Sequence, residues 1–172
     1  MKCLRETNYS LEDLEGKSIF KRLATRAIVL KGEEILLIYT KRYNDYSLPG
    51  GGVDPDEDIK KGLLRELHEE TGAVNVKILE EFGYYEEHRP TYYDGYDLIH
   101  MISYCYLCDA DKKLGDASPE QYEIENGSVP VWKNIHKAIA YNKNVIKENE
   151  HSMGLSIKRE TFLLEAIRDK YL

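Results

Sequence analysis

The feature that most restricts the fold of this chain is a glycine-rich turn that leads straight into a glutamate-rich helix. Residues 48–73 read LPGGGVDPDEDIKKGLLRELHEETGA. Asp54 followed by Pro55 predicts that the helix begins there, and Glu57 stands where a capping-box carboxylate would reach back. Gly72 predicts the end, because glycine readily takes the left-handed conformation just past a helix.

The glutamates occupy an unusual position on this predicted helix. Ile59 and Leu63 are four residues apart, which indicates a buried face. Continued at helical spacing, the same face reaches Glu66 and Glu70, and Glu69 lies beside them. Three carboxylates in one patch repel one another and resist the loss of water. The pattern therefore calls for a compensating positive charge.

Two kinds of positive charge fit the pattern. Arg65 is adjacent in the sequence. A hard divalent cation such as Mg²⁺ is the better candidate, because it takes oxygen ligands and leaves positions for substrate phosphates. The glycines at 50–52 allow close approach of the backbone, so the combination favours metal-bridged phosphate chemistry. The plainer alternative is a solvent-exposed helix face that follows an ordinary loop.

The spacing also matches a known family signature. The fixed positions of the pattern Gly-x5-Glu-x7-Arg-Glu-apolar-x-Glu-Glu-x-Gly-apolar are Gly51, Glu57, Arg65, Glu66, Leu67, Glu69, Glu70, Gly72 and Ala73. This run resembles the Nudix box, the signature of hydrolases that act on nucleoside diphosphates linked to another moiety. The resemblance implies an α/β protein with the Nudix-like α/β/α sandwich, in which a mixed β-sheet lies between helices.

The resemblance also implies roles for these residues. The metal, Mg²⁺ or Mn²⁺, would be held by the backbone carbonyl of Gly50 and by the carboxylates of Glu66, Glu69 and Glu70. The metal would neutralise phosphate oxygens and lower the pKa of the attacking water.

Two further residues of the box have a supporting role. Glu57 and Arg65 would orient the acidic cluster through charge-assisted hydrogen bonds. In this family the general base is a box glutamate, such as Glu69 or Glu70, or a glutamate on a later loop.

The later loop is the polar stretch 109–127. Within it, Glu120 and Glu123 are the candidates for an additional ligand or base. The alternative is that this stretch is a flexible acidic surface loop.

Residues outside the box would decide the substrate. The chain has 14 tyrosines. Tyr85 and Tyr92 are candidates to stack on a base, and Arg89 is a candidate to meet a phosphate. The alternative places such rings in the core or at a dimer contact. By the same resemblance, Pro90 lies near the position where ADP-ribose-cleaving members carry a proline, and Tyr92 near the position where dinucleoside polyphosphate cleavers carry a tyrosine. A nucleotide sugar and a nucleoside triphosphate, including an oxidised one, stay open.

The rest of the chain predicts one domain, 1–172, with a polar lead-in at 1–17. Apolar and alternating runs predict strands at 24–30, 34–39, 74–87, 98–108 and 129–132. Helices are expected to follow Asn134 and to cover 156–170. Strands interrupted by helices favour a mixed sheet covered by helices.

Composition excludes several classes of function. The net charge of −7 disfavours a nucleic-acid polymer as partner, because binding one needs a basic surface. No apolar run approaches the ~20 residues that cross a bilayer, so no membrane association and a cytoplasmic location are expected. Cys105 and Cys108 have CxxC spacing on a predicted strand, where residues three apart point to opposite faces. A homodimer is a family-level expectation.

The resemblance leaves one alternative of another class. Some Nudix domains sense nucleotides and regulate partners without hydrolysis, and such domains tend to lose box carboxylates. This box is complete. Hydrolysis is therefore the first expectation, and the non-catalytic nucleotide-sensing regulator is the alternative.

Overall fold

The computed structural model describes residues 1–10, 13–91, 93–148 and 151–172. Within these ranges the chain forms seven strands and four helices. In chain order they are β1 (Cys3–Asn8), β2 (Ile19–Lys31), β3 (Glu34–Thr40), β4 (Asp45–Ser47), α1 (Ile59–Thr71), β5 (Lys77–Pro90), β6 (Leu98–Asp109), α2 (Gln121–Asn126), β7 (Ser128–Asn134), α3 (Ile135–Glu148) and α4 (Ile157–Tyr171).

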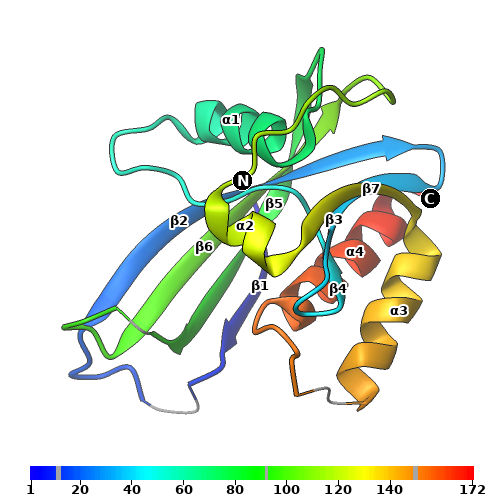
Figure 1. The fold of residues 1–172 in the computed structure, drawn as a ribbon. Coiled ribbons are helices and arrows are strands. Elements are labelled where there is room, and N and C mark those ends of the chain that lie inside the picture. Colours follow the sequence, from blue (N-terminus) through cyan, green and yellow to red (C-terminus); the bar gives the residue numbers. More distant parts are fainter. Residues whose placement is uncertain (11–12, 92, 149–150) are drawn as a thin grey trace.

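The sheet is mixed, as predicted. Its strand order is β1-β5-β6-β2-β3-β4, and β7 pairs with β3 beside this path. β1 runs parallel to β5 and β2 parallel to β6, while the other pairs are antiparallel. Most of β2 pairs with β6, and its last two residues turn to pair with β3. Figure 1 shows α1 on one side of the strands and α3 and α4 on the other.

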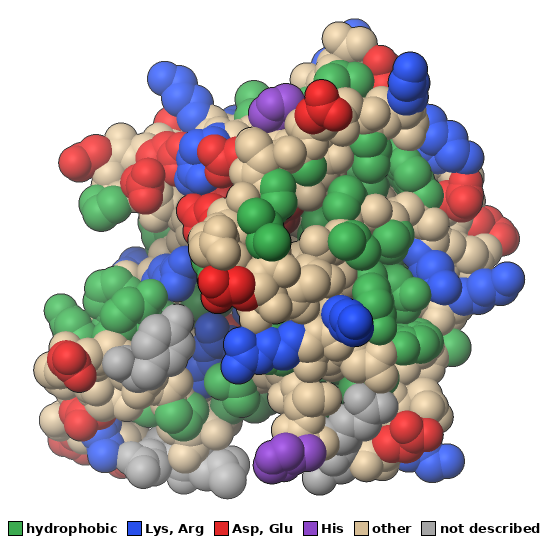
Figure 2. All heavy atoms as spheres, in the orientation of Figure 1, with side chains coloured by type: hydrophobic (Ala, Val, Ile, Leu, Met, Phe, Trp, Pro, Cys, Tyr) green, Lys and Arg blue, Asp and Glu red, His purple; other side chains and the backbone are tan. Residues whose placement is uncertain are grey.

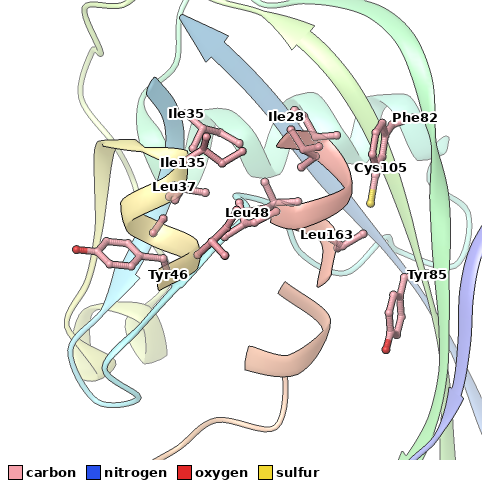
Figure 3. Packing of buried hydrophobic residues seen from close by; sticks show 14 residues of the cluster. Ile28, Ile35, Leu37, Tyr46, Leu48, Phe82, Tyr85, Cys105, Ile135 and Leu163 are labelled. Carbon is pink, nitrogen blue, oxygen red and sulfur yellow. The ribbon is translucent and has the colours of Figure 1, made fainter. Parts of the chain in front are cut away.

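Two apolar clusters fill the space between the sheet and the helices. Alternate residues of a strand point to opposite faces, so β2 contributes to both clusters. Ile28 packs with Leu163 of α4 in the larger cluster (Figure 3). Ala27 and Val29 pack against Leu63 of α1 in the smaller one. Helix, sheet and helix therefore form three layers, which confirms the expected sandwich.

The helix of the Nudix-like box begins four residues later than predicted. Its N-cap is Asp58, whose side chain accepts two backbone N–H bonds from the first turn, both of 3.1 Å. Asp54 and Pro55 lie in a turn before it, where the Glu57 amide bonds to the Asp54 carbonyl at 3.0 Å. Asp58 is the cap because its carboxylate accepts hydrogen bonds from two of the unpaired amides of the first turn at once. The predicted end is confirmed, since Gly72 is left-handed with φ 67°.

Two other parts of the chain differ from expectation. The polar lead-in contains a strand, β1, which carries few buried side chains and pairs with the edge of β5 through its backbone. Such an edge strand has no apolar alternation to reveal it. The stretch 109–127, expected to be a loop, contains α2, a single short helix.

The cysteine prediction is confirmed in its geometry. Cys105 lies in the larger cluster and Cys108 in the smaller one, on opposite faces of β6. Both thiols are free and buried, and burial raises the pKa of each to about 12. Among the described residues, no helix combines the length and apolar character that a membrane crossing requires.

Candidate active site

The glycine-rich segment runs beside β2 like an extra strand. Backbone amides of β2 donate to the carbonyls of Pro49, at 2.8 Å, and Gly51, at 2.9 Å. Gly50 has φ 138°, and a Cβ there would lie 2.1 Å from the Thr25 carbonyl oxygen. Only glycine fits this position.

The same segment receives two carboxylates of α1. The amide of Gly50 donates to Oε2 of Glu70 at 2.5 Å. A Cβ on Gly51 would come within 2.3 Å of Oε2 of Glu66. The glycines therefore make room for the acidic side chains, and α1 and the segment form one site.

Arg65 ties the acidic residues together. Its Nε and Nη2 donate to Glu57 at 2.9 and 2.8 Å. Its Nη1 donates to Glu66 at 2.7 Å and to Glu69 at 3.1 Å, and its Nη2 also reaches the Gly52 carbonyl at 3.2 Å. Hydrogen bonds from Arg65 lower the pKa of Glu57 to about 2. This geometry fits the orienting roles that the sequence predicted for Glu57 and Arg65.

Helix α2 brings a further carboxylate to Glu70. Glu123 is only 6% exposed, and its side chain accepts the Glu120 backbone amide at 2.7 Å in a capping box. Burial raises the pKa of Glu70 well above its usual range, and a hydrogen bond with Glu123 raises it further. Burial also raises the pKa of Glu66, against the influence of Arg65. The carboxylates from α1 and α2 therefore share one desolvated region.

Glu120 and Glu123 occupy different places. Glu120 lines a cavity of about 520 Å³ together with Glu66 and Glu69. Glu123 instead contacts a small void of about 10 Å³ beside Glu70, roughly the size of one water. The sequence singled out both glutamates. It did not reveal α2, although the Glu120-x-x-Glu123 spacing is that of a capping box.

The donor set suits a hard divalent cation. Within the described ranges, no three His, Cys, Asp or Glu side chains already converge on one point. Glu66 and Glu69 are held by Arg65, and Glu70 by the Gly50 amide. Burial raises the pKa of Glu66 and of Glu70, and neighbouring glutamates add to the effect. A divalent cation would offset this negative charge, with oxygen ligands from these carboxylates and the Gly50 carbonyl.

The three residues predicted to contact the substrate differ in position. Arg89 lines a cavity of about 410 Å³ that Gly50, Gly51 and Gly52 also border. Tyr85 is 1% exposed, and its hydroxyl bonds to Thr7 at 2.9 Å. Its ring packs in the larger cluster, so the core alternative replaces the predicted stacking role, because a ligand cannot reach the ring. Tyr92 lies outside the described residues.

Comparisons with known proteins agree with this architecture. A family model described as the NUDIX domain matches residues 20–149. An RNA pyrophosphohydrolase of Brucella ovis is 41% identical over 58 residues, which make up 34% of this chain and 30% of that protein. A Bacillus subtilis protein provisionally named an 8-oxo-dGTP diphosphatase is 36% identical over 67 residues, or 39% and 43% of the two chains. The chain therefore spans less than half the length of these relatives.

Solved structures show the same fold. A NUDIX hydrolase from Nitrosomonas europaea superposes with a TM-score of 0.57 over 88% of each chain, at 16% identity. A NUDIX-family hydrolase from Clostridium perfringens gives 0.53 over 88% of this chain and 99% of its own, at 11% identity. At such identities the likeness concerns the fold alone.

Proposed function

Because this chain belongs to the NUDIX family, we propose that it is a metal-dependent hydrolase that cuts a diphosphate linkage in a nucleoside diphosphate derivative. The observation that carries the proposal is the meeting of Glu70, from α1, with Glu123, from α2, at the backbone of Gly50. A buried group of acids beside a half-buried glycine backbone is costly unless a cation and an anionic substrate complete it.

The reaction is the attack of water on one phosphorus. The bridging P–O bond breaks, and the released phosphate keeps the bonding electrons. Glu66, Glu69, Glu70 and the Gly50 carbonyl would hold Mg²⁺ or Mn²⁺, which would neutralise phosphate oxygens and make water more acidic. Arg65 holds the carboxylates of Glu66 and Glu69 in place through hydrogen bonds to both.

The proton of the attacking water passes to a carboxylate. Glu123 is the favoured acceptor, since it is desolvated beside Glu70 and a small void adjoins both side chains. A carboxylate held within reach of the attacking water is placed to take its proton. Glu120, in the wider cavity, is the second candidate.

The substrate belongs to a short range of compounds. The two curated relatives carry the names RNA pyrophosphohydrolase and 8-oxo-dGTP diphosphatase. A nucleoside triphosphate, including an oxidised one, is therefore the first candidate, followed by ADP-ribose, nucleotide sugars and dinucleoside polyphosphates. A long RNA is disfavoured by the net charge of −7.

A phosphate-release assay over this panel, with and without Mg²⁺, tests the proposal. Replacing Glu70 with Gln (E70Q) removes a ligand charge but keeps the shape of the side chain. We expect kcat/KM to fall about 100- to 10,000-fold while the melting temperature stays near that of the parent. The matched control is Glu34→Gln, which alters an exposed ion pair with Lys112 at the start of β3 and should leave kcat/KM unchanged.

The outcomes separate enzyme from regulator. Metal-dependent turnover that E70Q removes supports the hydrolase. Binding of nucleotides without turnover of any compound would favour the non-catalytic regulator. Full activity in E70Q would refute the assignment of the site.

A further inference from the structure

A second cavity beside the acidic site is lined by positive charge. It measures about 410 Å³ and is bordered by Gly50, Gly51 and Gly52. Arginines from three elements line it: Arg22 and Arg26 of β2, Arg89 of β5 and Arg159 of α4. No Asp or Glu is among the described residues that line it. Figure 2 shows a hollow in this face with blue Lys and Arg side chains inside and red carboxylates above it.

The arginines gather there for a structural reason. Arg22 and Arg26 are four residues apart on β2, so both point to the same face of the sheet. Between them lies the small side chain of Ala24, and Met101 of β6 pairs in register with Arg22. The small side chain of Ala24 and the flexible side chain of Met101 thus leave room for a ligand beneath the guanidinium groups.

The carboxylates that pair with these arginines lie beneath the surface of the cavity. Arg159 bonds to Glu87 at 2.7 Å and to Glu160 at 2.8 Å, and all three side chains are at most 3% exposed. Glu160 also meets Arg26 at 3.5 Å. Arg26, Arg89 and Arg159 thus share two buried glutamates, Glu87 and Glu160. In a chain with a net charge of −7, such a cavity attracts anions locally.

Arg22 lies where the two cavities meet. Arg22, Gly52 and Tyr122 line both the arginine cavity and the acidic cavity of about 520 Å³. The Arg22 guanidinium donates to the hydroxyl of Tyr93 at 2.9 Å, and a Cβ on Gly52 would come within 2.7 Å of the Arg22 Nη2. A phosphate chain that is cleaved over the carboxylates would therefore continue past Arg22 into the arginine cavity.

We propose that the arginine cavity binds a phosphate group beyond the two that the cleaved bond joins, so that the substrate is a nucleoside carrying three or more phosphates. This inference rests on the proposed hydrolase function and narrows its substrate class. A diphosphate joined to a neutral sugar would place an uncharged group among four guanidiniums, which lose hydration without gaining an anion. Arg22 is the specificity-determining residue, because it stands at the entrance between the two cavities.

Kinetics with matched substrates test this inference. The substrates are a nucleoside triphosphate and a diphosphate sugar of the same nucleoside. We expect kcat/KM to favour the triphosphate at least about 10-fold. Arg22→Gln should lower kcat/KM for the triphosphate about 10- to 100-fold, chiefly through KM, and leave the value for the sugar compound within about threefold. Arg22→Lys keeps the positive charge but loses the paired hydrogen bonds that a planar guanidinium can donate to a phosphate. Its kcat/KM for the triphosphate should therefore lie between those of Arg22→Gln and the parent.

The control variant is Arg168→Gln. Arg168 is half-buried near the end of α4, away from both cavities, where it pairs with the exposed Asp169. We expect this variant to leave both substrates unaffected. Equal loss on both substrates in Arg22→Gln, or a preference for the sugar compound, would overturn the inference while the hydrolase function stands. A strong preference for a 5′-triphosphorylated oligonucleotide over the free nucleotide would overturn the inference that the substrate is a free nucleotide.

A binding measurement keeps the inference testable without turnover. Inorganic tripolyphosphate and pyrophosphate are titrated into the parent and into Arg22→Gln by calorimetry. We expect the parent to bind tripolyphosphate more tightly, and the variant to lose that advantage. If neither anion binds the parent, or if the variant keeps the parent's preference for tripolyphosphate, the arginine cavity is not a phosphate site. Absence of turnover with all substrates would refute the hydrolase proposal separately.

Discussion

At the scale of single residues, the environment of a carboxyl group decides what it does. Glu57 and Glu70 belong to the same box. Hydrogen bonds from Arg65 lower the pKa of Glu57 to about 2, whereas burial raises the pKa of Glu70. The sequence predicts that both are carboxylates of one site. It does not predict their opposite shifts, because these depend on which groups surround each one.

A carboxyl outside the proposed site has a measurable pH signature. Asp45 is 3% exposed, and burial, with the nearby Glu160, raises its pKa from 3.8 to about 7. Between these two pH values the folded protein holds a proton on Asp45 that the unfolded chain releases. The stability that the protonated carboxyl allows is therefore complete below about pH 4 and is lost as the pH rises to about 7. The full loss is on the order of 4 kcal/mol.

Replacing Asp45 with Asn should remove this dependence. We expect Asp45→Asn to match the parent in unfolding free energy near pH 4 and to exceed it by a few kcal/mol at pH 8, measured by urea unfolding. The control is Asp109→Asn, since the ion pair of Asp109 with Lys31 lowers its pKa instead of raising it. A constant difference between Asp45→Asn and the parent across this range would contradict the prediction.

At the scale of elements, one long helix was predictable and one short helix was not. The apolar spacing and the Gly72 cap of α1 are local signals, and both are seen in the structure. α2 has only six residues, and just one of them, Glu123, is buried. A helix of that length forms only with tertiary support, so its sequence carries no periodicity to read.

The position of α2 gives a prediction about the base. If Glu123 accepts the proton from water, Glu123→Gln should lower kcat about 100- to 10,000-fold, while Glu120→Gln lowers it far less. Both variants keep a side chain of the same shape at the capping box. Circular dichroism and melting temperature monitor whether the fold is retained. The reverse order of effects would assign the base to Glu120.

At the scale of the whole molecule, the larger cluster joins the sheet to the last helix. Leu163 of α4 is fully buried with Ile28 of β2 and Ile135 of α3 (Figure 3). These residues come from the first and last parts of the chain. A core with this composition predicts that residues 1–172 unfold as one cooperative unit.

Leu163→Ala tests that cooperativity. We expect it to lower the unfolding free energy by about 2–5 kcal/mol, because it removes buried methyl groups and leaves a cavity. The fluorescence of Trp132, the single tryptophan, and far-ultraviolet circular dichroism should report the same transition. Two separate transitions would mean that the chain contains more than one independently folding domain.

The sequence by itself determined the spacing of the box carboxylates, the end of α1 and the alternation of the strands, because helical and strand periods are local. Only the tertiary structure decided that Glu123 meets Glu70, that Tyr85 is buried and that arginines of β2, β5 and α4 line one cavity. These contacts join residues far apart in the chain. They depend on strand order and helix packing, which no local pattern specifies.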